Sequence, residues 1–255
     1  MNSKLSNSKS SNIMIGVILA AGMAKRLRPL TDACPKCLLK IGERTLLQRT
    51  VDAMIAADIN ELVVVTGYRA EMIREFLTKQ YPSLNIHFIH NGDYEHNNNI
   101  FSLWMTRPYT EGKDFLLSDS DILFDPALIR AVLAADGNAL ALNRHECGEE
   151  EIKVIVDSDN RIMELSKTCS IEKAIGESVG FEKMTAAYSI ALFQELEQMI
   201  EREGLINVFY ERAFERLIPQ GHTFRIVDTT NFFSIELDTP EDFENAKQLI
   251  PAALY

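Results

Sequence analysis

The junction between a short apolar run and a basic loop near the start of the chain constrains the fold more than any other feature. The run, residues 13–19, is rich in Ile and Val, as is typical of a strand covered on both faces of a parallel sheet. Residues 20–22 are two alanines and a glycine, whose small side chains allow backbone N–H groups to approach an anion closely. Arg26, Arg28 and Lys36 add positive charge to the same loop. The junction therefore predicts a strand that leads directly into a phosphate-binding loop.

Strand-like and helix-like periods alternate along the chain that follows. Strands are expected at residues 62–65, 86–89, 115–117 and 139–142, and helices at residues 45–57, 70–77 and 127–133. This alternation predicts an α/β protein with a Rossmann-like, mostly parallel sheet flanked by helices. In such a sheet the ligand lies at the carboxyl ends of the strands.

The rhythm changes after about residue 150. Residues 152–156 and 161–165, joined by Asp-Ser-Asp-Asn, predict a β-hairpin within a small substrate lobe. The elements expected after the hairpin are helices at 189–203 and 207–218, strands near 224–227 and 233–237, and a final helix.

Charge and cysteine content exclude several classes of protein. The chain has 37 acidic and 26 basic residues and a net charge of −11, which argues against a nucleic-acid-binding surface. The four cysteines are too few and too scattered for a disulfide scaffold. Cys34 and Cys37 form a C-x-x-C, but no second Cys or His pair has zinc-finger spacing. We expect reduced thiols in a cytoplasmic protein.

The N-terminal apolar run imitates a signal peptide, because Lys4 and Lys9 precede it. Gly16 interrupts the run, however, and the run continues into the basic loop, so we interpret it as the first strand. No stretch approaches the about 20 apolar residues that cross a bilayer, and membrane insertion is not expected.

Two acidic clusters follow predicted strands. Asp119 and Asp121 end the apolar run 115–118, at the place where an α/β sheet presents ligand-binding groups. Glu236 and Asp238 share one face of a strand because they are two residues apart, and a Thr-Pro pair typical of a helix start follows them. Carboxylates are hard oxygen ligands, so both clusters are candidates for a Mg²⁺ site.

The loop from Leu19 to Lys36 resembles the signature of the sugar-nucleotidyltransferase family, whose members transfer a nucleotidyl group from a nucleoside triphosphate onto a phosphate. The resemblance implies a fold of the nucleotide-diphospho-sugar transferase type, with Arg26 and Lys36 as catalytic residues that bind the triphosphate. One position departs from the pattern, since Ala24 stands where the family usually has a second glycine. Alanine has less backbone freedom there, which puts in question the loop conformation and nucleotide preference of the commoner members.

The resemblance also assigns the acidic clusters. In the family, the aspartate that ends the first cluster and the aspartate before the Thr-Pro helix together hold the Mg²⁺ that bridges the nucleotide and acceptor phosphates. This implies Asp121 and Asp238 as metal ligands, with Glu236 as a helper and Mg²⁺ as the cofactor.

The nucleotide is expected to contact the basic loop and the ends of neighbouring strands. Gly67 and Tyr68 end the second strand and are placed to touch the base or the ribose, although a plain strand-to-helix turn has the same pattern. The expected nucleotide-binding residues are Leu19, Ala20, Ala21, Gly22, Met23, Ala24, Lys36, Gly67, Tyr68, Asn98 and Ser120.

The acceptor has to be inferred from less specific sequence. Residues 97–104 resemble the Asn-Asn-Ile segment of the phosphocholine cytidylyltransferase branch, and residues 152–181 resemble cytidylyltransferases that act on phosphocholine, aminoethylphosphonate or inositol phosphate. Lys153 and Lys167 are candidates to grip an acceptor phosphate, although solvated strand-edge lysines fit the pattern equally well. The candidates to receive a cationic amine are Glu177, Glu211, Trp104, Tyr188 and Tyr210.

These observations predict a Mg²⁺-dependent cytidylyltransferase that transfers CMP from CTP to phosphocholine or 2-aminoethylphosphonate and releases pyrophosphate. The alternatives are a nucleotidyltransferase acting on a sugar 1-phosphate or inositol phosphate and a non-catalytic regulatory subunit. A dinucleotide-binding oxidoreductase requires a G-x-G-x-x-G that this loop lacks. A homodimer is compatible with the sequence.

We expect a disordered tail at residues 1–12, which are rich in Ser, Asn and Lys, and one nucleotidyltransferase domain over residues 13–255. The expected parts of this domain are a nucleotide-binding part at 13–150, an acceptor-binding part at 151–238 and a C-terminal helix at 239–255.

Overall fold

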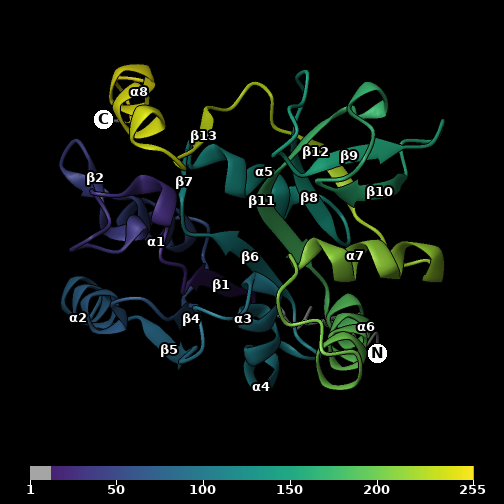
Figure 1. Cartoon of the computed structure of the whole chain (residues 1–255), viewed down its shortest axis with the longest axis horizontal. Helices are drawn as coiled ribbons and strands as arrows, with labels where there is room; N and C mark the ends of the chain where they lie inside the picture. The colour runs from purple at the N-terminus through teal and green to yellow at the C-terminus, as the bar shows by residue number, and fades with distance from the viewer. Residues whose placement is uncertain (1–12, 255) are drawn as a thin grey trace, which may run out of the picture.

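The computed structural model describes residues 13–254, so the predicted tail at residues 1–12 lies outside the described residues. Within this range a nine-stranded sheet crosses the molecule (Figure 1). Its strands are β1 (Ile15–Ala20), β4 (Glu61–Thr66), β5 (Asn85–His90), β6 (Phe115–Asp119), β8 (Ala139–Asn143), β9 (Lys153–Val156), β10 (Ile162–Ser166), β11 (Gly176–Met184) and β12 (Arg225–Asp228).

The strand order is β10-β9-β11-β6-β1-β4-β5, and β8 joins β11 to β12 beside this path. β1 pairs in parallel with β4 and β6, and β4 pairs in parallel with β5, so the carboxyl ends of these four strands meet at one edge. β11 runs antiparallel to β6, β8 and β9 and thereby connects the parallel half to the hairpin of β9 and β10. The predicted fold class, a mostly parallel sheet with a hairpin-containing lobe, is confirmed.

Helices cover both faces of the sheet (Figure 1). One face packs against α1 (Leu46–Ile55), α2 (Ala70–Gln80) and α5 (Ala127–Ala134). The other face packs against α3 (Asn99–Met105), α6 (Ala186–Glu197) and α7 (Glu211–Leu217), while α4 (Arg107–Thr110) follows α3. β1 shows why both faces are covered: Val17 belongs to one core cluster and Ile18 to the other, because side chains alternate along a strand.

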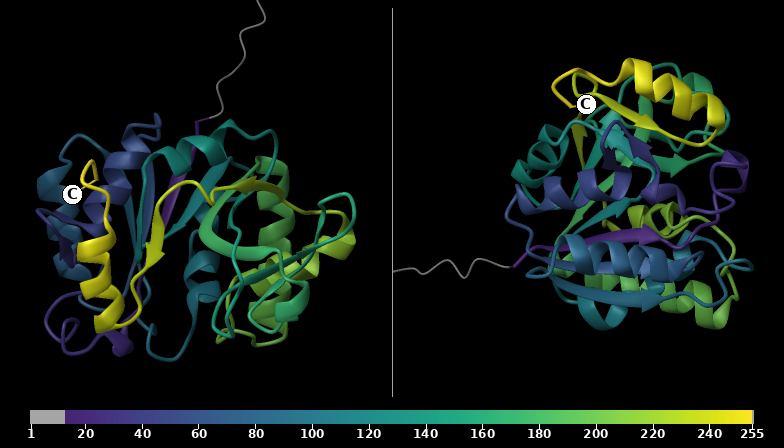
Figure 2. Two further views of the ribbon diagram at one scale, coloured as in Figure 1. Left: turned by 90° about the horizontal axis from the view of Figure 1, so that it is seen from above. Right: turned by 90° about the vertical axis from the view of Figure 1, so that its left-hand side faces the viewer.

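The C-terminal helix α8 (Pro240–Leu249) lies beside segments from the start of the chain (Figure 2). Leu237 and Phe243 form a hydrophobic cluster with Leu27, Ile41 and Leu46. The other small elements here are β2 (Lys40–Ile41), β3 (Arg44–Thr45), and the antiparallel pair of β7 (Ile122–Phe124) and β13 (Ser234–Glu236). This packing brings α8 and β13 against the loop and the short strands that follow β1.

Several sequence predictions differ from the structure. The long strand β11 was not predicted, because glycines and buried polar residues interrupt its apolar pattern. The predicted helix 207–218 begins only at Glu211, and the predicted helix 189–203 begins earlier, at Ala186, and ends in a π-helical turn, Gln198–Arg202. Among residues 13–254, no helix combines the length and the apolar character needed to span a membrane.

Candidate active site

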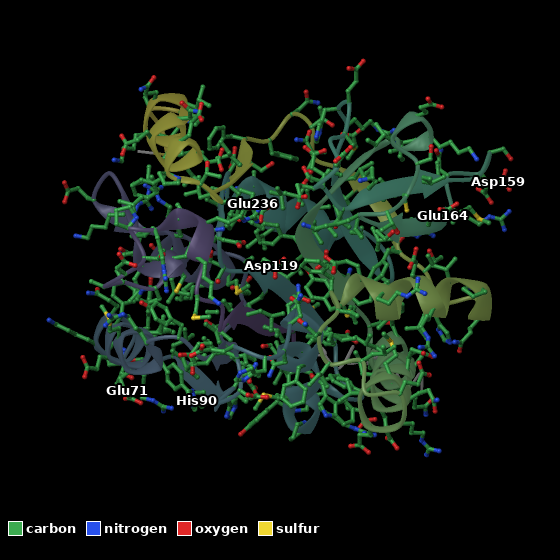
Figure 3. All side chains as sticks on the ribbon, viewed as in Figure 1. Glu71, His90, Asp119, Asp159, Glu164 and Glu236 are labelled. Carbon is green, nitrogen blue, oxygen red and sulfur yellow. The ribbon has the colours of Figure 1, made fainter. Side chains whose placement is uncertain are left out.

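A cavity of about 870 Å³ opens at the carboxyl ends of β1, β6 and β8. Figure 3 shows Asp119 and Glu236, which both line it, near the centre of the molecule, whereas Glu71 and His90 lie at the periphery. The lining residues fall mainly in the segments 19–26, 35–37, 91–99, 119–122, 143–152, 177–180, 209–211 and 234–242. The cavity therefore collects residues from both halves of the sheet.

The loop after β1 turns at Ala24, which takes the left-handed backbone conformation with a φ of 45°. Two donors hold this turn: the Thr31 hydroxyl and the Leu27 N–H each donate to the Ala24 carbonyl at 3.0 Å. The Leu27 side chain is fully buried beneath the loop. An alanine thus makes the turn for which glycine is the usual choice, at a conformational cost of about 1–2 kcal/mol.

Lys36 reaches from the basic loop to both acidic clusters. Its Nζ lies 3.0 Å from Asp121 Oδ2 and 2.9 Å from Asp238 Oδ1. Arg26 Nη2 lies 2.5 Å from Asp238 Oδ2. Burial opposes the charge on Lys36, but the two aspartates outweigh it and raise the pKa of the lysine. Burial likewise opposes the charge on Asp238, and the adjacent Lys36 and Arg26 nevertheless lower its pKa.

Strand pairing and a helix cap explain how the acidic residues meet. β13 pairs with β7 so that Glu236 lies opposite Ile122, and the Leu237 N–H donates to the Asp121 carbonyl at 3.2 Å. α8 then begins with a capping box, in which the hydroxyl of Thr239 accepts from the Asp242 N–H and the Asp242 carboxylate accepts from the Thr239 N–H. The cap fixes the backbone directly after Asp238.

The carboxylates of Asp121, Glu236 and Asp238 offer oxygens that all lie within 4.8 Å of one another. Glu236 is exposed on the cavity wall, but protein atoms still displace much of the water around its carboxyl group. This desolvation, together with repulsion from Asp121 and Asp238, raises the pKa of Glu236 to about 8. Mg²⁺ prefers hard oxygen ligands, and a bound cation would relieve the repulsion among the three carboxylates. This group of side chains therefore fits Mg²⁺.

The opposite end of the cavity is lined by Lys167, Phe209 and several carboxylates. Lys167 Nζ lies 4.8 Å from the centre of the Phe209 ring and 3.6 Å from Glu150 Oε2. The carboxylate of Glu177 lies 3.8 Å from His145 Nε2. Burial, and then repulsion from Glu151, raise the pKa of Glu177 to about 7.

A second group of possible metal ligands, His145, Cys147 and Glu151, lies at this end, with ligand atoms within 4.8 Å of one another. His145 Nε2 lies 3.1 Å from Glu151 Oε2, and the Gly148 N–H donates to the same oxygen at 2.8 Å. These contacts organise the loop between β8 and β9.

Residues 16–217 match the family model of the MobA-like NTP transferase domain. The chain belongs to this family. The family match and the fold confirm the sequence prediction that this chain is a nucleotidyltransferase of the cytidylyltransferase type.

Similar proteins place the NTP transferase domain among enzymes with different acceptors. A choline-phosphate cytidylyltransferase of Streptococcus pneumoniae is 30% identical over 238 residues, which cover 93% of this chain and 98% of that protein. A CMP-5'-(3-aminopropyl)phosphonate synthase of Streptomyces rubellomurinus is 26% identical over 242 residues. This match covers 90% of the present chain but only 38% of the synthase. The inositol-1-phosphate CTP transferase from T. maritima has the same fold, with a TM-score of 0.75, 21% identity and coverage of 96% of this chain and 94% of that structure.

Most residues predicted to bind the nucleotide line the cavity of the NTP transferase domain. They are Leu19, Ala20, Ala21, Gly22, Met23, Ala24, Arg26, Lys36, Asn98 and Ser120. Gly67 and Tyr68 do not line it. The Tyr68 hydroxyl instead donates to the Thr31 carbonyl at 2.8 Å, and a Cβ at Gly67 would lie 2.6 Å from the Ala21 carbonyl oxygen. These two residues support the loop of the NTP transferase domain from behind.

Two predicted acceptor residues of the NTP transferase domain need correction. Lys153 is 1% exposed, and its Nζ donates to the carbonyls of Gly148, Glu149 and Glu151 at 3.1–3.2 Å, so it fixes a loop rather than gripping a phosphate. Tyr188 is also 1% exposed and packs in the core. Neither residue lines the cavity. The path of the loop keeps the Lys153 side chain inside, and the apolar surroundings of α6 keep Tyr188 in the core.

The other predicted residues divide between the cavity wall and the core. Lys167, Glu177 and Glu211 line the cavity. Trp104 and Tyr210 do not, and they pack against the core cluster under α6 and α7.

Sequence reasoning missed an amide network on the cavity wall. Asn91 is 1% exposed, and its Nδ2 donates to Asn97 Oδ1 at 2.8 Å and to Ser102 Oγ at 3.1 Å. The run of three asparagines at 97–99 was the available signal, but only Asn98 was selected from it. Asn91 had no such signal, since its role depends on the turn that follows β5.

Proposed function

We propose that this chain transfers CMP from CTP to a phosphate or phosphonate oxygen of a small acceptor and releases pyrophosphate, with Mg²⁺ as the cofactor. One observation carries the proposal: Lys36 of the loop after β1 lies within 3.0 Å of both Asp121 and Asp238, which come from two other parts of the sequence. The three motifs therefore meet at the point where a triphosphate entering along the loop would place its reacting phosphorus.

Lys36 and Arg26 are the cations available to neutralise the triphosphate. Both pair with Asp238 in the structure, so a bound nucleotide has to compete with that carboxylate for them. Asp121, Asp238 and Glu236 would hold Mg²⁺, which would supply positive charge to neutralise the phosphates. The lysine and arginine would then be free to contact phosphate oxygens.

The reaction requires no general base on the protein. A phosphate monoester has a second pKa of about 6 and carries a nucleophilic anionic oxygen near neutral pH. The work of the chain is to align this oxygen with the α-phosphorus and the departing pyrophosphate, in line, and to neutralise the charge that collects there. Lys36 and Arg26 perform the second task from the loop.

The acceptor is inferred to be small and zwitterionic, such as phosphocholine or 2-aminoethylphosphonate. Lys167 lines the end of the cavity opposite the basic loop and is available for a phosphate or phosphonate oxygen. Glu177 and Glu211, on the same wall, are available for a positive group. Similar proteins are named for phosphocholine and for an aminopropylphosphonate, which supports this class.

Release of pyrophosphate from CTP tests the proposal. We expect Mg²⁺-dependent release with phosphocholine, phosphoethanolamine or 2-aminoethylphosphonate, and release about 100-fold slower with the Lys36→Ala variant at matched concentrations. Preference for glucose 1-phosphate, or for UTP or dTTP over CTP, would contradict the proposal in favour of a sugar-nucleotide pyrophosphorylase. Binding of CTP without turnover of any acceptor would favour a regulatory subunit.

A further inference from the structure

Three carboxylates without ion pairs lie together behind the acceptor end of the cavity. Asp119 ends β6, Glu182 lies on β11 and Glu211 begins α7. Glu182 is 0% exposed and Glu211 is 6% exposed. Electrostatic repulsion acts between Asp119 and both glutamates. Within residues 13–254, none of the three forms an ion pair with a cationic side chain.

The hydrogen bonds of this acidic group are incomplete. The Tyr210 hydroxyl donates to Asp119 Oδ2 at 3.0 Å, and the Ser178 hydroxyl donates to Glu182 Oε1 at 3.2 Å. Glu182 Oε2 and Glu211 Oε2 are both buried and have no hydrogen-bond partner. Leaving a buried carboxylate oxygen unpaired is costly, and of these two glutamates only Glu211 lines the cavity, where a donor from a bound ligand can reach it.

The acidic group is open toward the cavity on one side only. Glu211 and Asp119 line the cavity, whereas Glu182 lies behind them. Lys167 is the cation that acts on Glu211, and burial nevertheless raises the pKa of Glu211 to about 7. The protein therefore places a desolvated carboxyl group, which a cationic ligand would stabilise in its charged form, at the wall where the acceptor would bind.

The aromatic residues near this wall do not form a cage. Of the described residues that line the cavity, only Phe209 and Tyr94 are aromatic. The Phe209 ring is already covered by Lys167 Nζ at 4.8 Å, and Tyr94 packs against Tyr68 behind the nucleotide loop. A quaternary ammonium requires aromatic faces, whereas a primary ammonium requires acceptors for its three N–H groups.

Resting on the proposed function, we propose that the acceptor carries a primary ammonium group that Glu211 and Asp119 receive, and that the site selects against the trimethylated ammonium. A primary ammonium donates a hydrogen bond to Glu211 Oε2 and another to Asp119, and it places a positive charge against the acidic group. Three methyl groups remove every donor and leave Glu211 Oε2 unpaired. The substrate class is therefore an aminoalkyl phosphate or aminoalkylphosphonate.

The matched pair of phosphoethanolamine and phosphocholine tests this selection, because the two differ only in three methyl groups. We expect kcat/KM with CTP to be at least about 100-fold higher for phosphoethanolamine. The Glu211→Gln variant should lose most of this preference, chiefly through a higher KM for phosphoethanolamine. The control is Glu215→Gln on the same helix, whose carboxylate pairs with Arg212 and should leave the preference unchanged.

Equal or better use of phosphocholine would overturn the inference, as would an unchanged preference in Glu211→Gln. Melting temperatures of both variants establish that they fold. If no acceptor is turned over, the proposed function fails, and calorimetric titration of the same pair in the absence of CTP still decides the inference. Binding of phosphoethanolamine that is lost in Glu211→Gln supports it, and equal binding of both compounds contradicts it.

Discussion

The two ends of the cavity hold their carboxylates in opposite ways. At the end where we propose that the nucleotide binds, Asp238 contacts both Lys36 and Arg26, so its negative charge is already balanced by the chain. At the end proposed for the acceptor, Glu211 is buried with one oxygen unpaired and no ion pair. A ligand at the first end must displace Asp238 from Lys36 and Arg26, whereas a ligand at the second end supplies the hydrogen-bond donor that Glu211 lacks. The first arrangement suits a ligand that brings its own cation, and the second suits a ligand that is itself a cation.

Removing the carboxylates that we propose to bind Mg²⁺ should have the largest effect. Asp121→Ala and Asp238→Ala are each expected to lower kcat by about 1,000-fold, because charge neutralisation at the reacting phosphates is lost. Both side chains are partly exposed, so the fold should remain. The measurement is pyrophosphate release across a Mg²⁺ titration, with Asp159→Ala on the exposed hairpin as the control. Near-normal rates in either variant would refute the metal assignment.

Lys36→Ala should have the next largest effect, and it should change CTP binding and the rate of transfer rather than the response to Mg²⁺. We expect a rise in KM for CTP and a fall in kcat of about 100-fold, with the Mg²⁺ response retained. The comparison variant is Lys36→Arg, which keeps the charge but cannot occupy the same narrow position between two aspartates. If Lys36→Ala abolished the Mg²⁺ response instead, the lysine and the carboxylates would form one inseparable unit.

The acceptor end should make folding stability depend on pH. The pKa values of Glu177 and Glu211 rise from the usual 4.5 to about 7, because both are desolvated. The folded state holds these protons more tightly than the unfolded state. The contribution of this proton binding to the free energy of unfolding is therefore complete below pH 4.5 and is lost as pH rises to about 7.

Glu211→Gln isolates the contribution of the more deeply buried group. The free energy of unfolding of the variant, relative to the native chain, should increase by on the order of 2 kcal/mol between pH 5 and pH 8. Urea unfolding at both pH values measures the difference. A difference that does not change with pH would mean that Glu211 titrates normally.

The smallest effect is expected at Ala24, in the loop of the nucleotide end. Ala24→Gly relieves the left-handed strain of the side chain but makes the unfolded chain more flexible, so the two effects nearly cancel, to within about 1 kcal/mol. Ala24→Val should destabilise more, because a branched side chain is disfavoured at a φ of 45°. The melting temperatures of the two variants provide the test. Equal melting temperatures would show that the loop adjusts its backbone.

The nucleotide end was largely predictable from the sequence, because its signals are local. A strand followed by small and basic residues predicts the loop, and strand-end carboxylates in a parallel sheet meet at one edge. The structure brings Asp121, Glu236 and Asp238 together in this way, and their binding of Mg²⁺ stays a prediction.

The acceptor end was less predictable, because its residues depend on contacts that are distant in sequence. Glu182 is fully buried on β11, and a buried glutamate runs against the apolar pattern from which a strand is predicted. Lys153 was assigned to a phosphate, but the backbone path of residues 148–151 determines that its ammonium contacts three carbonyls. Neither the burial of Glu182 nor the carbonyl contacts of Lys153 can be recognised from the sequence around these residues.

The packing of α8 against the nucleotide loop has a consequence for how the protein is made. Leu27 and Ile41 share their hydrophobic cluster with Leu237 and Phe243, and Asp238 lies between the latter two in sequence. In a nascent chain that has not yet reached Leu237, the loop after β1 lacks the side chains of Leu237 and Phe243 that pack against it. Lys36 also lacks its partner Asp238. The triphosphate site that we propose can therefore form only after α8 has emerged and packed against Leu27 and Ile41.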